Sequence, residues 1–326
     1  MKPGSERAIS VAGAGPAGAS AAITALRLGA GVTLFDPASP RHKVCGEFLS
    51  AEVEPVLRDL GVWDRIIAAG AVRYERLILH FGRVTRTTVF AERPLGLSRF
   101  ALDRVLLDEA LRAGARLERA RAENPAIIAH GRKLAASGGR RVFAFKAHFQ
   151  GPVGDEVELY FADGWYVGVN RVENGVTNVC GLAGEAILRR FGFSPSALLD
   201  SWEPLRERLR PLARSMKWLM TGPLVFGRHG ACATYRAGDA FSFADPFTGS
   251  GLLAAMLTGC SAGEAAALGR PVAEHERWCR SLLRRQSAVS CVFRFLLRTG
   301  AAELLSGFVP AGWLVAATRP GRPEQA

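Results

Sequence analysis

Three glycines in the spacing G-x-G-x-x-G constrain the fold of this chain more than any other feature. They are Gly13, Gly15 and Gly18. The apolar stretch 8–12 before them predicts a short buried strand, and the Ala- and Leu-rich stretch 19–28 after them predicts a helix. A second apolar strand is predicted over 32–35, directly before Asp36. This order of strand, glycine turn, helix and strand is typical of a unit that binds a dinucleotide.

The glycine turn predicts contacts with the diphosphate of such a ligand. The first glycine permits a tight turn, the second lets the backbone approach the diphosphate, and the third lets the helix pack closely on the strand. The helix N-terminus adds unbonded N–H groups and a partial positive charge. Asp36 stands where a carboxylate accepts hydrogen bonds from the adenosine ribose. The predicted binding residues of this unit are Gly13, Gly15, Pro16, Ala17, Gly18 and Asp36.

Three further stretches carry recognisable patterns. The pair GD at 238–239 is followed by PFTGSG at 246–251 and then by an apolar helix pattern that reaches residue 257. Residues 98–111 predict an amphipathic helix that opens with Arg99 and Asp103. The basic stretch RHKVCGEFLS, which contains one thiol, occupies 41–50.

In this order, the motifs resemble those of FAD-dependent oxidoreductases of the p-hydroxybenzoate hydroxylase type, and most of all their geranylgeranyl reductase branch. FAFKAHF at 143–149 and DGWYVGVNRVENGVTNVCG at 163–181 also resemble that branch. The resemblance covers nearly the whole chain. It implies FAD as cofactor and a mixed α/β fold, with a Rossmann-like FAD-binding domain, an inserted β-sheet domain and C-terminal helices. We expect the FAD-binding domain in 1–75, 98–140 and 230–270, the substrate-facing sheet in 76–97 and 141–229, and the helical segment in 271–326.

The resemblance also implies roles for the second glycine-rich region. In the family, the aspartate of the GD pair binds the ribityl chain of FAD, and Asp239 matches it. The PFTGSG loop matches the segment that crosses the pyrimidine edge of the flavin, and the next helix directs its positive end there. The residues implied are Gly238, Asp239, Pro246, Gly249, Ser250 and Gly251. Without the resemblance, Asp239 is a turn residue and PFTGSG is an ordinary loop before a helix.

The residues after the second strand leave alternatives open. Arg41 is our candidate for the FAD diphosphate and Lys43 a weaker one, and a solvated charge is the alternative. Arg99 and Asp103 match a family pair near the cofactor, but their spacing also suits an ion pair on an exposed helix. Cys45 matches a family cysteine near flavin and substrate. It is either a catalytic proton donor or an inert buried thiol.

The chain departs from the family pattern in its middle. Hydroxylase relatives carry A-D-G-x-x-S, and the corresponding stretch here is 126–137, with His130 in place of the aspartate. This change weakens the case for an ordinary NADPH-reduced hydroxylase, so NAD(P)H as electron donor stays open. His130 is either a site residue or a structural histidine. The short stretch 116–124 also replaces strands that relatives insert before this motif.

Three functions follow as hypotheses. The leading one is reduction of a carbon–carbon double bond in a hydrophobic, isoprenoid- or polyketide-like substrate, by hydride transfer from reduced flavin. The second is a monooxygenase or halogenase-like enzyme that requires oxygen. The third is a flavin- or lipid-binding module without turnover, suggested by the shortened middle. The aromatic residues that either line an apolar substrate site or fill the core are Phe145, Phe149, Tyr160 and Trp165.

Charge and cysteine usage bear on partners and location. The 42 Lys and Arg residues exceed the 30 Asp and Glu, giving a net charge of +12, which favours an anionic partner. The Arg-rich helical pattern over 275–319 suits either peripheral contact with an anionic membrane or packing on the FAD-binding domain. No nucleic-acid module and no run of about 18 apolar residues is present, so neither nucleic acid nor a membrane span is expected. The dispersed cysteines lack metal spacing and favour a cytoplasmic protein. The oligomeric state stays open.

Overall fold

A small parallel sheet holds the glycine turn. The computed structural model describes residues 7–299 except 83, 133–140, 153, 163, 229, 231, 244 and 246–248. The small sheet has five strands in the order β17-β9-β1-β2-β8, and every pairing in it is parallel. Their bounds are β1 Ala8–Ala12, β2 Gly31–Phe35, β8 Arg116–Glu118, β9 Ile127–Ile128 and β17 Tyr235–Arg236. The two strands predicted on either side of the glycine turn are therefore confirmed as β1 and β2.

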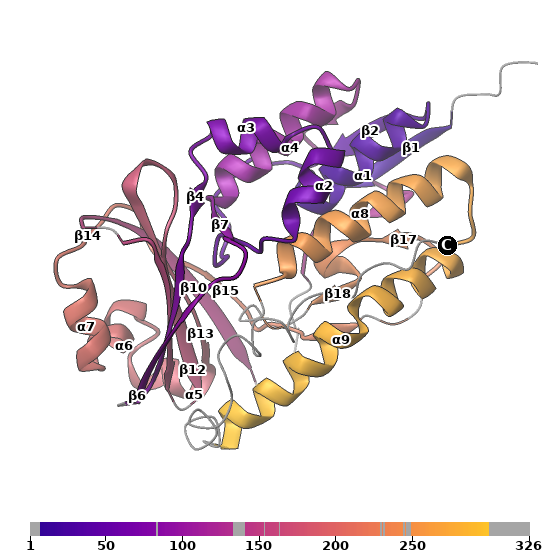
Figure 1. Ribbon diagram of the computed structural model, residues 1–326. Helices are drawn as coiled ribbons and strands as arrows, with labels where there is room; N and C mark the ends of the chain where they lie inside the picture. The colour runs from indigo at the N-terminus through magenta and orange to yellow at the C-terminus, as the bar shows by residue number, and fades with distance from the viewer. Residues whose placement is uncertain are drawn as a thin grey trace, which may run out of the picture.

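Helices cover the small sheet (Figure 1). They are α1 Pro16–Arg27, α4 Arg99–Arg112 and α8 Gly251–Leu268, with α2 Val53–Asp59 and α3 Trp63–Ala68 beside them. Helix α1 begins three positions earlier than the sequence predicts, at Pro16 rather than residue 19. The reason is that proline fits the first helical position, where its missing N–H group would have no partner inside the helix.

Helix α8 packs so closely on α1 that two of its positions leave no room for a side chain. A Cβ atom added to Gly259 would lie 2.2 Å from the Ala17 carbonyl oxygen, and one added to Gly263 would lie 2.2 Å from that of Ala21. By length and composition α8 could cross a membrane, but 56% of it is buried inside the protein. Small and polar residues interrupt the apolar pattern of α8, so the helix does not contain the run of about 18 apolar residues by which a membrane span is predicted.

A large mixed sheet forms the other half of the fold. Its eight strands include the path β14-β10-β13-β12-β11-β5-β6, and β15 pairs with β10. The bounds are β5 Arg76–Phe81, β6 Val84–Val89, β10 Val142–Gln150, β11 Glu156–Ala162, β12 Trp165–Arg171, β13 Val176–Gly184, β14 Ala213–Arg214 and β15 Leu219–Thr221. All eight strands fall within 76–97 and 141–229, the ranges in which the substrate-facing sheet is expected.

Three short helices, which the sequence analysis did not predict, cover the outer face of this sheet (Figure 1). They are α5 Glu185–Arg190, α6 Pro195–Asp200 and α7 Glu203–Leu209. Alternate residues of a strand point to opposite faces, so Phe145 and Phe149 face these helices while Ala144 faces the small sheet. Tyr160 and Trp165 belong to the same outer core. The four aromatic candidates are therefore core residues and not pocket residues.

Short elements connect the two sheets. They are β3 Phe48–Leu49, β4 Val72–Arg73, β7 Leu95–Gly96, β16 Gly227–Arg228, β18 Ser242–Phe243 and the 3₁₀ turns η1 Glu173–Gly175 and η2 Gly238–Ala240.

The last described helix, α9 Val272–Thr299, runs along the lower edge of the molecule in Figure 1. Its residues Cys279, Leu282 and Leu283 are buried against Phe241 and Ala254. The first half of α9 therefore packs on the unit that carries the glycine turn. Residues 300–326, part of the stretch for which membrane contact is predicted, lie outside the described residues.

Candidate functional site

A cavity of about 870 Å³ lies between the glycine turn and the inner face of the large sheet. This volume is in the range of roughly 300–1,000 Å³ that small-molecule and cofactor sites occupy. Its walls come from the glycine turn, the loop 41–48, the region 237–252 and strands β10, β13 and β15. The predicted motifs, which are far apart in sequence, thus meet around one cavity.

The glycine turn has the geometry that its sequence predicts. Gly13 has a φ of 105°, and a Cβ atom there would lie 2.5 Å from the Ala129 carbonyl oxygen. At Gly18 an added Cβ atom would lie 1.8 Å from the Gly13 carbonyl oxygen, so only glycine lets α1 start so close to β1.

Asp36 braces this turn. Its Oδ2 accepts a hydrogen bond from the Ala14 N–H at 3.1 Å, and its Oδ1 accepts one from the Ala38 N–H at 3.0 Å. Burial alone would raise the pKa of Asp36, but these N–H groups and the nearby Lys43 outweigh burial and hold the pKa below its usual value. Asp36 is thus an ionised pocket residue, and its contact with a ribose stays a prediction.

Two cations and one carboxylate lie over the start of α1. Lys43 Nζ is 2.9 Å from Asp103 Oδ2, and Arg99 binds the same carboxylate through Nε at 2.9 Å and Nη2 at 3.0 Å. A Cβ atom added to Gly15 would lie 3.4 Å from Lys43 Nζ and 3.6 Å from Arg99 Nη2. The Asp103 side chain is fully buried. The interpretation of this pair as an exposed ion pair is therefore wrong, and the trio has a net charge of +1.

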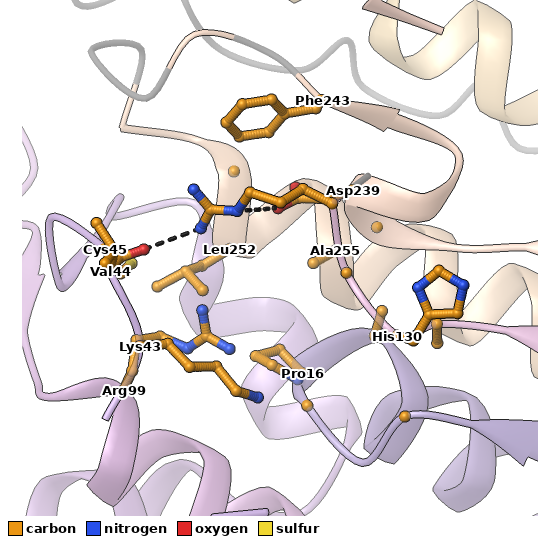
Figure 2. A pocket seen from close by; sticks show the side chains of 18 of the residues that line it. Pro16, Lys43, Val44, Cys45, Arg99, His130, Asp239, Phe243, Leu252 and Ala255 are labelled. Atoms are coloured by element: carbon orange, nitrogen blue, oxygen red, sulfur yellow. Dashed lines mark hydrogen bonds and ion pairs between the residues drawn. The ribbon is translucent and has the colours of Figure 1, made fainter. Parts of the chain in front are cut away.

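Figure 2 shows Lys43 and Arg99 near Pro16, on one side of the pocket. Arg41, the preferred candidate, also lines the pocket but is exposed. Burial lowers the pKa of Arg99, but the charge of Asp103 outweighs burial and raises it. Burial is also the largest influence on Lys43, and there it lowers the pKa. We therefore expect Lys43, whose Nζ is the nearer of the two cations to Gly15, to be the cation that meets a diphosphate at the helix N-terminus.

Replacing Lys43 with methionine tests this assignment. A charge-assisted hydrogen bond is worth about 1.5–3 kcal/mol, so we expect the Kd for ADP, the diphosphate half of FAD, to rise at least about tenfold. Isothermal titration calorimetry measures it. The matched variant Arg41→Met should change the Kd for ADP much less, because the Arg41 side chain is exposed. Equal effects of the two substitutions would contradict the assignment.

Asp239 faces the pocket from the opposite wall. Its Oδ2 lies 3.7 Å from Arg132 Nε, and Arg132 Nη2 donates a hydrogen bond to the Val44 carbonyl oxygen at 2.9 Å. These two contacts are the dashed lines in Figure 2. The Gly238 N–H donates to Thr258 Oγ1 at 2.9 Å, which ties the GD turn to α8. Arg132 thus bridges two walls of the pocket.

The start of α8 also reaches the pocket. Gly249 and Gly251 line it, and Ser250 between them is buried as the N-cap residue. A Cβ atom added to Gly249 would lie 2.8 Å from the Phe48 ring. Pro246, the remaining predicted residue of this loop, lies outside the described residues.

The far end of the pocket is apolar and contains two thiols. Cys45 is half-buried and lines the pocket, as do Ala144, Cys180 and Leu182 from the inner face of the sheet. Burial raises the pKa of Cys180 to about 12, so its thiol stays protonated at neutral pH. His130 lines the opposite region and is exposed, which excludes a buried structural role for it.

Sequence reasoning missed several polar residues beside this end of the pocket. They are Glu47, Lys146, His148 and Asp245, all buried. Glu47 and Asp245 line the pocket, and Asp245 Oδ1 accepts a hydrogen bond from the Tyr166 hydroxyl at 2.7 Å. Lys146 and His148 lie in the stretch FAFKAHF at 143–149. Polar side chains inside this otherwise apolar strand could have indicated a buried polar site. Among the described residues, no group of three or more His, Cys, Asp or Glu could hold a metal ion.

Comparison with known proteins places this geometry in a known fold. No protein-family description and no curated protein matches the sequence. The flavin-dependent brominase Bmp2 shares the fold with a TM-score of 0.75 and 16% identity, over 95% of this chain and 94% of the brominase. The flavin-dependent halogenase CmlS has a TM-score of 0.74 and 20% identity, over 98% of this chain and 68% of the halogenase. The tetrameric 2-methyl-3-hydroxypyridine-5-carboxylic acid oxygenase has a TM-score of 0.70 and 18% identity, over 96% of each of the two chains. This chain therefore has the mixed α/β fold of flavin-dependent halogenases and oxygenases, as its motifs predict.

Proposed function

We propose that this chain is an FAD-dependent oxidoreductase that uses oxygen to modify an apolar substrate, as a monooxygenase or a halogenase does. The observation that carries this proposal is the single cavity that runs from the glycine turn and its cations, past Asp239, to an apolar end. The three compared structures, whose names include a brominase, a halogenase and an oxygenase, share both halves of the fold and support it.

The pocket fits FAD by the chemistry of its walls. Lys43 and Arg99, together with the N–H groups at the start of α1, would hold the diphosphate. Asp36 would accept hydrogen bonds from the adenosine ribose, and Asp239 would accept them from the ribityl hydroxyls. The positive end of α8 would favour negative charge on the flavin ring. When bound, the flavin supplies two-electron redox chemistry, and the protein orients the substrate and excludes water.

Asp239 provides the sharpest test of cofactor binding. We expect Asp239→Ala to raise the Kd for FAD about tenfold or more, because the variant loses an acceptor for the ribityl hydroxyls. Quenching of flavin fluorescence measures the Kd. The control is Asp108→Ala, which removes an exposed carboxylate on α4. A purified protein that is colourless and takes up no added FAD would overturn the proposed function.

A second candidate is reduction of a carbon–carbon double bond, and the half-buried thiol of Cys45 on the pocket wall favours it. Chemically reduced, FAD-loaded protein with a panel of apolar alkenes and phenols separates the two functions without assuming NAD(P)H as donor. Products formed only with oxygen support the oxygenase. Saturated products formed without oxygen and lost in Cys45→Ala support the reductase. No product in either condition favours a binding module.

A further inference from the structure

A buried cluster of Glu47, Lys146 and His148 lies behind the pocket wall. Glu47 Oε1 accepts a hydrogen bond from Lys146 Nζ and another from the Arg99 backbone N–H at 2.7 Å. Glu47 Oε2 lies 2.7 Å from His148 Nε2. The side chains of Glu47 and Lys146 are fully buried, and that of His148 is 9% exposed. Both oxygens of one carboxylate are therefore held, by groups from two other segments of the chain, β10 and the start of α4.

This cluster joins the pocket to the protein interior. Lys146 and His148 alternate with Phe145 and Ala147 along β10, so they share the inner face with Ala144, which lines the pocket. Glu47 itself lines the pocket, next to Cys45. The ring of His42 lies edge-on to that of His148, with 5.3 Å between the ring centroids.

Packing alone is a poor explanation for the cluster. Apolar residues of similar volume often replace a buried ion pair with no loss of stability, and Glu47 also has a φ of 53°, which is unfavourable for a residue other than glycine. The charges of Glu47 and Lys146 cancel, so a proton on His148 would add one positive charge beside the pocket. Histidine is the side chain whose charge changes most readily near neutral pH.

The surroundings give His148 a route for that proton. His42 is exposed and lines the pocket, and burial, then the charge of Lys146, lowers the pKa of His42, so it is neutral and able to pass protons at neutral pH. Because a carboxylate only accepts hydrogen bonds, Nε2 of neutral His148 carries its hydrogen toward Glu47, and an added proton binds Nδ1. The other charged or titratable groups nearby are Lys43, Cys45, Tyr74, Arg99, Asp103, Glu173 and Cys180.

We propose that His148, held by Glu47 and Lys146, takes up one proton from solvent when flavin in the neighbouring pocket is reduced, and releases it when the flavin is reoxidised. The inference rests on the proposed function. The two electrons come from an external reductant, a hydride donor or dithionite, and stay on the flavin, which takes up one proton itself and so gains one negative charge. A second proton crosses from solvent past His42 to Nδ1. The positive charge gained then balances negative charge gained in the pocket.

Redox potentiometry of the FAD-loaded protein between about pH 5.5 and 8.5 tests the proposal. One proton per two electrons changes the midpoint potential by about 30 mV per pH unit. In the window where His148 exchanges its proton, we expect the wild-type potential to depend on pH more steeply than that of His148→Gln, by up to this amount. Glutamine keeps a donor for Glu47 but does not titrate. The control is His80→Gln, which changes a half-buried histidine that faces Glu158 in the same sheet, at 3.9 Å.

Equal pH dependence in the wild type and His148→Gln would overturn the inference and leave FAD binding intact. A protein that takes up no FAD would overturn both proposals. If His148→Gln fails to fold, ¹⁵N histidine spectra of the wild type decide: one neutral imidazole should become doubly protonated on reduction, and no change in any histidine would overturn the inference.

Discussion

Replacing Gly259 with valine is expected to lower the free energy of unfolding by about 3 kcal/mol or more, the upper end of the usual effect of overpacking. The reason is that even one added carbon would lie 2.2 Å from the Ala17 carbonyl oxygen, and backbone atoms cannot move aside as a flexible side chain can. Because α1 and α8 both start at the pocket, separating them should also weaken FAD binding.

Thermal unfolding followed by circular dichroism measures this effect. For a protein of this size, 3 kcal/mol corresponds to a fall in Tm of roughly 5–10 °C. The matched control is Gly251→Ala in the same helix, where an added Cβ atom would meet nothing within 4 Å. Similar losses of Tm in the two variants would contradict a special role for the contact between α1 and α8, because helix propensity alone favours alanine and valine over glycine.

Replacing Lys146 with methionine should be the most damaging single change in the large sheet. It leaves the fully buried carboxylate of Glu47 without its cation, and removing one partner of a buried pair costs about 3–5 kcal/mol. The double variant Glu47→Gln/Lys146→Met should recover more than half of that loss, since a neutral amide can still accept from the Arg99 N–H. Urea unfolding of the wild type, Glu47→Gln, Lys146→Met and the double variant measures these effects. Additive losses would show that the two side chains do not act as a pair.

The same pair predicts how stability depends on pH. Burial raises the pKa of Glu47, but the hydrogen bond from His148 and the charge of Lys146 outweigh it and hold the pKa below its ordinary value of 4.5. A depressed pKa in the folded state means that the stability Glu47 contributes is complete above about pH 4.5 and declines as the pH falls below that value. The urea midpoint of the wild type should therefore fall more between pH 7 and pH 4 than that of the double variant.

The local parts of the site could be predicted from the sequence. The glycine turn, its two strands and Asp36 lie within 29 consecutive residues, 8–36, and their chemistry depends on contacts between neighbours in the chain. Arg99 and Asp103 are one helical turn apart, so their pairing was predictable too. Their burial was not, because it depends on Lys43 approaching from another loop.

The cluster of Glu47, Lys146 and His148 could not be predicted from the sequence, because its members are far apart in the chain. Glu47 is 99 and 101 positions from its two partners, and the contact depends on which face of β10 turns toward the loop. Alternation shows that 145 and 149 share a face, but not which face meets the pocket. The sequence therefore could not decide whether the aromatic residues of β10 belong to the core or to the pocket. The decision depends on the three helices that cover the outer face.

The position of α9 has a consequence for how the protein is made. Leu283 and Gln286 of this helix form part of the pocket wall, although the glycine turn on the opposite wall comes much earlier in the chain. Domains generally begin to fold as they leave the ribosome, from the N-terminus onward. The nascent chain therefore carries an incomplete pocket until α9 has emerged.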